Sequence, residues 1–277
     1  MEGWKYYNHA LIPEGPPDQQ PDTRMICSGE IWKQAPRGAF LARWTSDFDC
    51  GYDTGWYYLI RKAPFDLESL SKKSRKHIRQ ALKKTYVRKV DPREYAEQIY
   101  AVDVETCKTY DHYTLSRTLE QLQNCQDETL DYWAAFSAED HRMIGFLQCK
   151  RTDHHVEGLV AKYLPKDLKL QASDALRFTI LQYYLNEQGY RYCCAGSRSI
   201  SHETNVQEYL IRNFGYEKAF CKLHIHYRPI VAMAVKVLYP FRKLLKKLEG
   251  NGLVHKINGI LTMEEIVRLQ RERKHGD

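Results

Sequence analysis

Residues 131–227 alternate between strand-like and helix-like periods, and this alternation restricts the fold more than any other feature of the chain. Three strand-like runs come first, and a helix, a strand, a second helix and a last strand follow. The expected ranges are 131–137, 143–151, 156–164, 172–188, 190–195, 203–213 and 219–227. Gly189 and Gly215 stand where the two helices should end. The order predicts a sheet covered by helices, which is an α/β architecture.

The preceding residues add elements with the same two periods. Aromatic-rich runs between residues 25 and 61 predict short strands joined by turns. Asp66 or Ser69 can cap a helix whose apolar residues fall on one face. The clearest expected strands are 56–60 and 85–90, and the expected helices end near residues 84, 107 and 125.

The two ends of the chain differ from its middle. Four prolines, the last of them Pro21, leave little room for regular structure at the start, so residues 1–24 are expected to form an irregular arm. Residues 25–227 are expected to form one domain, since a chain of 277 residues can bury a sizeable core, and the alternative is two small lobes. Residues 228–277 are expected to form a basic, amphipathic helical segment.

Positive charge is concentrated in two segments. The formal net charge is +7, but residues 71–90 alone hold nine Lys or Arg and no acid. Residues 228–277 hold eleven bases and five acids. An anionic ligand or surface is therefore expected at one or both of these places.

Cysteine and histidine usage indicates neither disulfides nor a metal. The eight cysteines are scattered without CxxC spacing, so we expect reduced core thiols. His224 and His226 share a strand face but have no third ligand in register, so no metal site is expected. The start lacks a basic region followed by an apolar run, and no stretch approaches about 20 apolar residues. We therefore expect a cytoplasmic protein, with peripheral contact to the inner membrane face left open.

Two parts of the alternating region resemble the GNAT (Gcn5-related N-acetyltransferase) superfamily. The string Asn213-Phe214-Gly215-Tyr216-Glu217-Lys218 is similar to the helix end that leads into the last strands of GNAT proteins. Residues 174–196 resemble the long helix, glycine stop and strand of the GNAT core. The resemblance implies a central mixed, mostly antiparallel sheet with helices on both faces. It also implies a V-shaped split between two parallel strands that holds an acyl donor.

The first half resembles the FemAB-like branch of the superfamily. Residues 56–62, Trp-Tyr-Tyr-Leu-Ile-Arg-Lys, and the basic run 70–81 are similar to its opening strand and first helix. This branch includes aminoacyl-tRNA-dependent transferases. On that resemblance, Arg75 and Arg79 are expected to bind an anionic substrate, and the alternative is a solvated basic surface. The two resemblances together cover residues 56–227.

The turn before the second-half helix departs from the GNAT pattern. Enzymes of the superfamily that use acyl-CoA usually carry a glycine-rich turn whose backbone N–H groups bind pyrophosphate, whereas Gln171 and Ser173 stand in place of glycines here. A helix N-terminus still attracts an anion, and lysines stand beside it. The residues expected to bind the donor are Lys166, Lys169, Gln171, Ala172 and Ser173. The alternative is an ordinary solvated loop.

The resemblance implies where the chemistry should lie. Glu157 falls on the strand where many GNAT enzymes place a Glu base, although a single acid in an alternating strand can also simply face solvent. The loop at 196–203 follows the strand on the other side of the split. In this loop, Ser197 and Arg198 are expected to bind substrate and His202 to act in catalysis. The alternative is a polar connection in which a serine caps the next helix. The tyrosine that many GNAT enzymes use as a general acid would fall near position 211, which is Ile here.

Residues 230–248 form a basic amphipathic segment that Pro240 should break into two short helices. Such a segment suits an anionic membrane surface or a carrier protein, and the alternative is that it packs on its own domain.

These observations predict an N-acyltransferase that moves an acyl group from a carrier thioester, acyl-CoA or acyl-carrier protein, to an amine of a sugar, amino acid or lipid precursor. The thioester would be a co-substrate, and no tightly bound cofactor is expected. One alternative is an aminoacyl-tRNA-dependent, FemAB-like transferase. Another is a degenerate GNAT domain that acts as a scaffold or binds a membrane surface.

Overall fold

The computed structural model describes residues 1–109, 115–200, 205–248 and 252–274, and it divides into two compact units. Unit 1 comprises Met1–Tyr58, Ser197–Thr204 and Lys218–Asp277, and unit 2 comprises Leu59–Gly196 and Asn205–Glu217. These boundaries differ from the expected ones at residues 24 and 227. Unit 1 is assembled from both ends of the chain because β11 (Lys222–Tyr227) pairs antiparallel with β3 (Leu41–Ser46).

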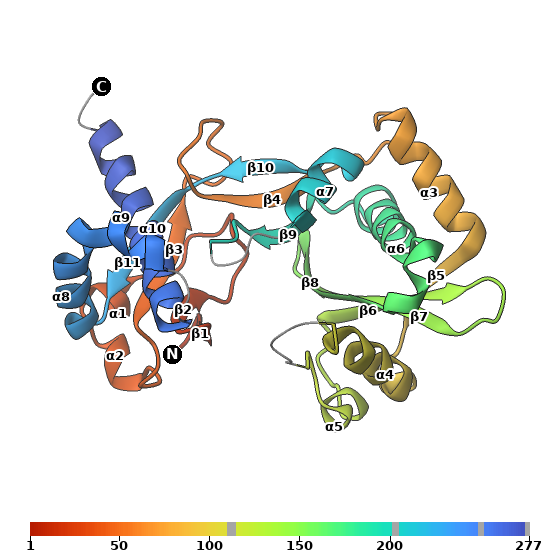
Figure 1. Cartoon of the computed structure of the whole chain (residues 1–277), viewed down its shortest axis with the longest axis horizontal. Helices are drawn as coiled ribbons and strands as arrows, with labels where there is room; N and C mark the ends of the chain where they lie inside the picture. The colour runs from red at the N-terminus through yellow and green to blue at the C-terminus, as the bar shows by residue number, and fades with distance from the viewer. Residues whose placement is uncertain (110–114, 201–204, 249–251, 275–277) are drawn as a thin grey trace. The chain divides into compact units, whose positions relative to one another are not determined.

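Unit 2 contains most of a mixed seven-stranded sheet (Figure 1). Its spatial order is β10 (Glu217–Phe220), β4 (Tyr57–Lys62), β9 (Tyr192–Ser197), β8 (His155–Tyr163), β7 (Met143–Arg151), β6 (Leu130–Ser137) and β5 (Thr85–Val90). The strands β5 to β8 are antiparallel neighbours, whereas β8 and β9 are parallel. The predicted sheet type is confirmed, and β6 and β7 match the strands expected at 131–137 and 143–151.

Helices cover both faces of this sheet, as predicted (Figure 1). On one face, α3 (Lys72–Lys84), α6 (Ala172–Leu181) and α7 (Asn205–Phe214) pack on a core that includes Leu147 and Cys149. On the other face, α4 (Ala96–Cys107) and α5 (Leu119–Gln123) pack on Phe146 and Tyr132. Successive strand residues point to opposite faces, so the apolar runs of β6 and β7 supply both cores. We call these the α6 face and the α4 face.

The parallel strands β8 and β9 pair over three residues and then separate. The paired positions are His155 with Tyr192, Val156 with Cys193, and Glu157 with Cys194. Beyond Glu157, β8 runs on to Tyr163 without further pairing to β9. This divergence is the V-shaped split that the resemblance implies. We call the position at Glu157 and Gly158 the apex of the split.

The structure corrects three expectations about local elements. The start of the chain is a hairpin of β1 (Trp4–Tyr7) and β2 (Ala10–Pro13) rather than an irregular arm, because three of the four prolines lie beyond β2. Two short helices, α1 (Arg24–Cys27) and α2 (Ile31–Gln34), stand where strands were expected. The expected strand at 219–227 is interrupted at Cys221, and its halves, β10 and β11, belong to different sheets.

Two helices also differ in detail from the prediction. Ser71, rather than Asp66 or Ser69, caps α3, since its side chain accepts a hydrogen bond from the Ser74 N–H. The helix expected over 172–188 is α-helical only to Leu181 and continues as a π-helix, η2 (Gln182–Glu187). Both differences lie at helix ends, where sequence periodicity is least informative.

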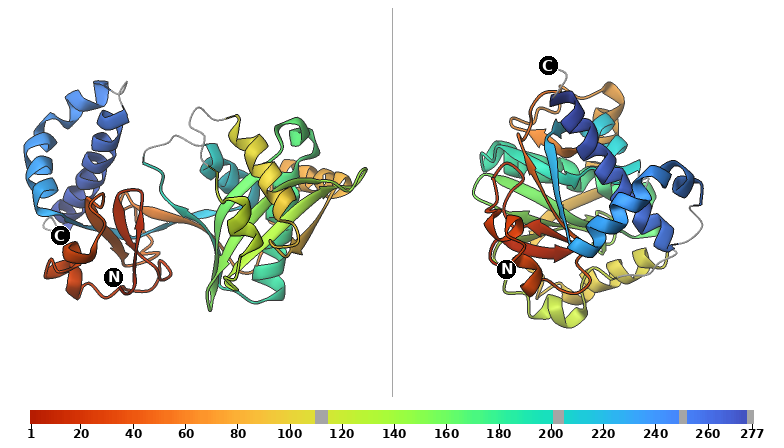
Figure 2. Two further views of the ribbon diagram at one scale, coloured as in Figure 1. Left: turned by 90° about the horizontal axis from the view of Figure 1, so that it is seen from below. Right: turned by 90° about the vertical axis from the view of Figure 1, so that its left-hand side faces the viewer.

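Unit 1 combines a four-stranded sheet, β1-β2-β3-β11, with the C-terminal helices (Figure 2). These helical elements are α8 (Pro229–Leu238), η3 (Tyr239–Phe241), α9 (Arg242–Leu245), η4 (Lys246–Leu248) and α10 (Gly252–Lys274). The predicted break at Pro240 is confirmed by η3.

Ile266 and Val267 of α10 pack against Trp56 and Leu223. Among the described residues, no helix is long and apolar enough to cross a bilayer. No disulfide joins any of the eight cysteines, all of which lie in the described ranges.

Candidate functional site

Glu157 lies at the apex of the split on the α4 face. It is the last β8 residue paired on both sides, with Lys150 in β7 and Cys194 in β9. Its neighbour Val156 packs in the core of the α6 face, so the alternation of the strand turns Glu157 to the other side. The residue is half-buried. This is the strand and the end of the split where the sequence predicts a base.

Arg177 of α6 lies at the same apex on the opposite face. A Cβ added at Gly158 would meet the Arg177 Nη1 atom and the Cys194 carbonyl oxygen, each at 3.7 Å. The guanidinium donates to the Tyr216 hydroxyl at 3.1 Å and lies 5.7 Å from the centre of that ring. Among the described residues, no carboxylate forms an ion pair with Arg177. Sequence reasoning missed this residue, although a single Arg among the apolar residues of the α6 sequence is a signal that could have found it.

The turn before α6 has the backbone shape of a glycine turn without a glycine. Gln171 adopts the left-handed conformation, with φ 59° and ψ 37°, between η1 (Pro165–Leu170) and α6. Ala172 is buried and Ser173 half-buried in the first turn of the helix. The expected donor-binding residues Lys166 and Lys169 are exposed on η1. The structure thus brings the five expected residues to one helix N-terminus.

A buried carboxylate and a phenol adjoin that N-terminus. The Tyr209 hydroxyl of α7 donates to the Asp174 carboxylate and also lies 3.5 Å from the Ser173 Oγ. Burial raises the pKa of Asp174, and the hydrogen bond from Tyr209 opposes the shift. Burial also raises the pKa of Tyr209, with the Asp174 charge adding to the effect. Tyr209 is therefore a protonated phenol that donates a hydrogen bond at the start of α6, whereas the usual tyrosine of the superfamily would fall near position 211.

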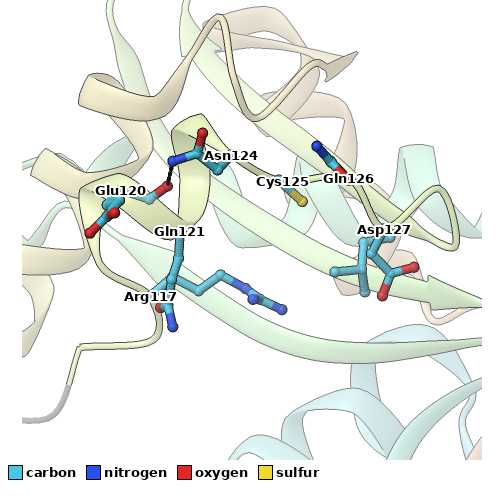
Figure 3. Close-up of a pocket in the computed structure, with 8 residues that line it drawn as sticks. Arg117, Glu120, Gln121, Asn124, Cys125, Gln126 and Asp127 are labelled. Atoms are coloured by element: carbon cyan, nitrogen blue, oxygen red, sulfur yellow. Dashed lines mark hydrogen bonds between the residues drawn. The ribbon is translucent and has the colours of Figure 1, made fainter.

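A polar hollow of about 370 Å³ lies beside α5 in unit 2 (Figure 3). Arg117 extends into it. Hydrogen bonds from Thr129 hold the pKa of Asp127 low, and the charges of Lys150 and Arg117 add to the effect. Lys150 is paired with Leu130 of the hollow on one side and with Glu157 at the apex on the other. The hollow is lined by Arg117, Glu120, Gln121, Asn124, Cys125, Gln126, Asp127 and Leu130.

Two buried polar side chains lie on the same face without a hydrogen-bond partner. The Tyr132 hydroxyl and the Gln148 Nε2 belong to residues paired across β6 and β7 that are 1 % and 3 % exposed. Burial raises the pKa of Tyr132 to about 12, and nearby Arg117 opposes the shift. Buried polar groups nearly always have a partner, so these two are suited to a bound water or a ligand group.

A buried ion pair lies further along the α4 face. Asp103 of α4 pairs with Lys162 of β8 at 3.2 Å, and the Cys107 thiol lies 3.3 Å from each of them. Burial alone would raise the pKa of Asp103, but hydrogen bonds from Ser116, Lys162 and Cys107 bring it below its ordinary value. The charge of this carboxylate is thus satisfied within unit 2.

The remaining predicted site residues lie elsewhere. Arg79 pairs with Glu68 at 2.8 Å, and Arg75 donates to the carbonyl oxygens of Glu68 and Leu70, so both arginines already have partners. Ser197 and Arg198 belong to unit 1, where Arg198 donates from its backbone and its guanidinium to residues 57 and 55. His202 lies outside the described residues. The substrate-binding and catalytic roles expected of these residues therefore remain predictions.

Solved structures share this fold. FemX is similar over 76 % of this chain and 77 % of its own, with a TM-score of 0.55 and 11 % identity. L-PGS from Bacillus licheniformis matches over 85 % of this chain and 83 % of its own, with a TM-score of 0.51 and 16 % identity. The C-terminal domain of a putative lysylphosphatidylglycerol synthetase from Agrobacterium fabrum matches over 85 % and 84 %, with a TM-score of 0.51 and 13 % identity. The fold is therefore GNAT-like, in the form found in FemX. No protein-family model and no curated protein matches the sequence.

Proposed function

We propose that the protein is an N-acyltransferase whose reaction takes place at the apex of the β8–β9 split. The observation that carries this proposal is that a carboxylate and a guanidinium flank one point from opposite faces of the sheet. Glu157 approaches the apex from the α4 face and Arg177 from the α6 face. A base on one side and a cation on the other are what amine attack on a carbonyl requires.

Each group has a defined part in such a transfer. Glu157 accepts a proton from the acceptor amine, whose nitrogen then attacks the acyl carbonyl and forms the new C–N bond. Arg177 donates hydrogen bonds to the oxygen that gains negative charge. Collapse of the tetrahedral intermediate breaks the bond to the leaving group, which takes up a proton. Holding both reactants at the apex supplies much of the remaining rate.

A carrier thioester, acyl-CoA or acyl-carrier protein, is the proposed donor. The left-handed turn at Gln171 leaves the first N–H groups of α6 available for a phosphate, and two exposed lysines stand beside them. Asp174 lies in the same turn, where its carboxylate accepts a hydrogen bond from the Tyr209 hydroxyl. These donors belong to the cytoplasm, where we therefore place the reaction.

An aminoacyl-tRNA is the second candidate donor, favoured by the surface of α3. Lys72, Lys73, Lys76 and Lys83 are exposed there, and the helix contains no acid. The Lys84 ammonium donates to the Lys169 carbonyl oxygen at 3.2 Å, which joins this surface to the start of α6. The fold shared with FemX and L-PGS is consistent with this candidate. Binding through phosphates would fall steeply as salt rises.

The acceptor is proposed to be an amine on a sugar, an amino acid or a lipid precursor that approaches from the α4 face. The Arg117 hollow lies on that side, so an acceptor that also carries a carboxylate or phosphate fits best.

The test is a transfer assay with labelled acyl-CoA, acyl-carrier-protein thioester and aminoacyl-tRNA against a panel of amines. We expect transfer from one donor class, and we expect Glu157→Gln to lower turnover about 10²- to 10⁴-fold while donor affinity stays unchanged. The matched control is Glu139→Gln, an exposed acid in the β6–β7 turn. Wild-type turnover in Glu157→Gln would remove this residue from the mechanism. Transfer from none of the three donors would instead favour a non-catalytic scaffold or membrane-surface binder.

A further inference from the structure

The C-terminal helical segment of unit 1 presents an uncovered line of apolar side chains. The first three share one side of α8, and the last three follow at the same intervals of three or four through η3, α9 and η4. They are 55–73 % exposed, whereas large apolar side chains are usually covered. The line consists of Ile230, Met233, Val237, Phe241, Leu244 and Leu248.

This exposure is not the result of an undocked segment. Val235 is 6 % exposed, and Leu238 and Leu245 are half-buried, so a second apolar side of the same segment packs within unit 1. Arg242 also pairs with Glu265 of α10 at 3.0 Å. The segment is thus held in place by one side while the other apolar side faces outward. Packing on its own domain, the alternative that the sequence left open, accounts for only a minority of its large apolar side chains.

The charges beside the exposed line are all of one sign. Lys236, Lys243, Lys246 and Lys247 are exposed, and residues 228–248 contain no Asp or Glu. An outward apolar line with a basic border matches the two components of a lipid surface, acyl chains beneath anionic headgroups.

We propose that residues 230–248 bind the surface of an anionic lipid bilayer, with Phe241 and the leucines inserted at the level of the headgroups. The binding needs no catalytic event and does not depend on the proposed acyl transfer. It would hold the full chain peripherally at the membrane.

The apolar half of the proposal is tested by co-sedimentation of the full chain with phosphatidylglycerol-containing vesicles and with neutral phosphatidylcholine vesicles. We expect binding to the anionic vesicles and at least a roughly tenfold weaker partition for the double variant Phe241→Ser, Leu244→Ser. The control is Val206→Ser on α7, which removes an apolar side chain of the same 57 % exposure from unit 2. Thermal melts should be the same for all three proteins, because the substituted side chains are exposed.

The electrostatic half is tested by the triple variant Lys243→Glu, Lys246→Glu, Lys247→Glu. Each lysine near a charged bilayer contributes about a fivefold factor, so we expect a loss of roughly 100-fold or more. Lys72→Glu, Lys73→Glu, Lys76→Glu changes the same number of charges on α3 and should bind as wild type does. Equal loss in both triple variants, or equal binding to neutral vesicles, would overturn the proposal. It would also fail if wild type ignored vesicles but formed a dimer, or bound acyl-carrier protein, through Phe241.

Discussion

Two buried aspartates, one on each face of the unit 2 sheet, differ in how their charge is satisfied. Asp103 on the α4 face has an ammonium partner in Lys162, and the pKa of its carboxyl is lowered. Asp174 on the α6 face accepts a hydrogen bond from the Tyr209 hydroxyl, and burial raises the pKa of its carboxyl. Conversely, Arg177 on the α6 face is a cation to which no described residue supplies a carboxylate.

The difference distinguishes a charge that is neutralised within the chain from charges that a bound ligand could neutralise. The Asp103–Lys162 pair is compensated within the chain, so its contribution should be to stability. On the α6 face, the helix that begins at the proposed phosphate site carries Asp174, whose pKa is raised by burial, and Arg177, to which no described residue supplies a carboxylate. Removal of a charge on the α4 face should therefore lower stability, whereas removal of the Arg177 charge on the α6 face should lower turnover.

The largest expected effect is on turnover. Arg177→Met should lower kcat about 10²- to 10³-fold, because it removes donors aimed at the developing oxyanion. Arg177→Lys, which keeps the charge but loses the planar fork, should recover only part of the rate. Tyr216→Phe is the control for the hydroxyl that Arg177 contacts. If Arg177→Met lowers the melting temperature but not kcat, the guanidinium contributes only to stability. The two faces would then not differ in function.

The next effect is on stability and belongs to the α4 face. Asp103→Asn should lower the free energy of unfolding by about 3 kcal/mol at neutral pH, because it leaves the Lys162 ammonium buried without a counter-charge. Urea denaturation measures this, and Asp103→Asn, Lys162→Met should recover part of the loss. Since the folded pKa of Asp103 is lowered, the contribution is present above the ordinary pKa of about 3.9 and is lost as the pH falls through the folded value. A variant as stable as wild type would show that water, rather than Asp103, compensates Lys162.

A smaller effect is expected at the hollow. Arg117→Ala should weaken acceptor binding about tenfold while donor binding and the melting temperature stay unchanged, since a charge-assisted hydrogen bond is lost. Isothermal titration with acceptors that carry or lack an anionic group separates charge recognition from shape. Arg24→Ala, an exposed arginine of unit 1, is the control. If the acceptor binds the wild type and Arg117→Ala with the same affinity, the acceptor site does not include this hollow.

The smallest effect is expected at Asp174. Asp174→Asn should change the free energy of unfolding at neutral pH by less than about 1 kcal/mol, because no ammonium or guanidinium loses its partner. The pH dependence should be opposite to that of Asp103. A raised folded pKa makes stability fall as the pH rises from about 4 to that value, and this fall should be absent in Asp174→Asn. A large loss of stability at neutral pH would show that the hydrogen bond with Tyr209 outweighs the cost of burial.

The sequence by itself determined the order of elements in unit 2 and the place of the split. Strand and helix periods repeat every two to four residues, so they can be recognised locally, and Gly189 and Gly215 each lie just beyond the helix that they end. The strand that carries Glu157 and the helix start at Ala172 were therefore found within one or two residues. The charges of residues 71–90 also indicated correctly that α3 has an exposed basic surface.

Only the tertiary structure decided which side chains meet. Asp103 and Lys162 pair across 59 positions, and β3 and β11 pair across about 180, distances over which no period in the sequence carries information. The place of Arg177 over Gly158 depends on the packing of α6 against β8. Likewise, the amphipathic pattern of residues 230–248 predicted an apolar side, but burial showed that one apolar line is docked and another is exposed. Periodicity is a property of each segment, whereas pairing and burial depend on the segments that surround it.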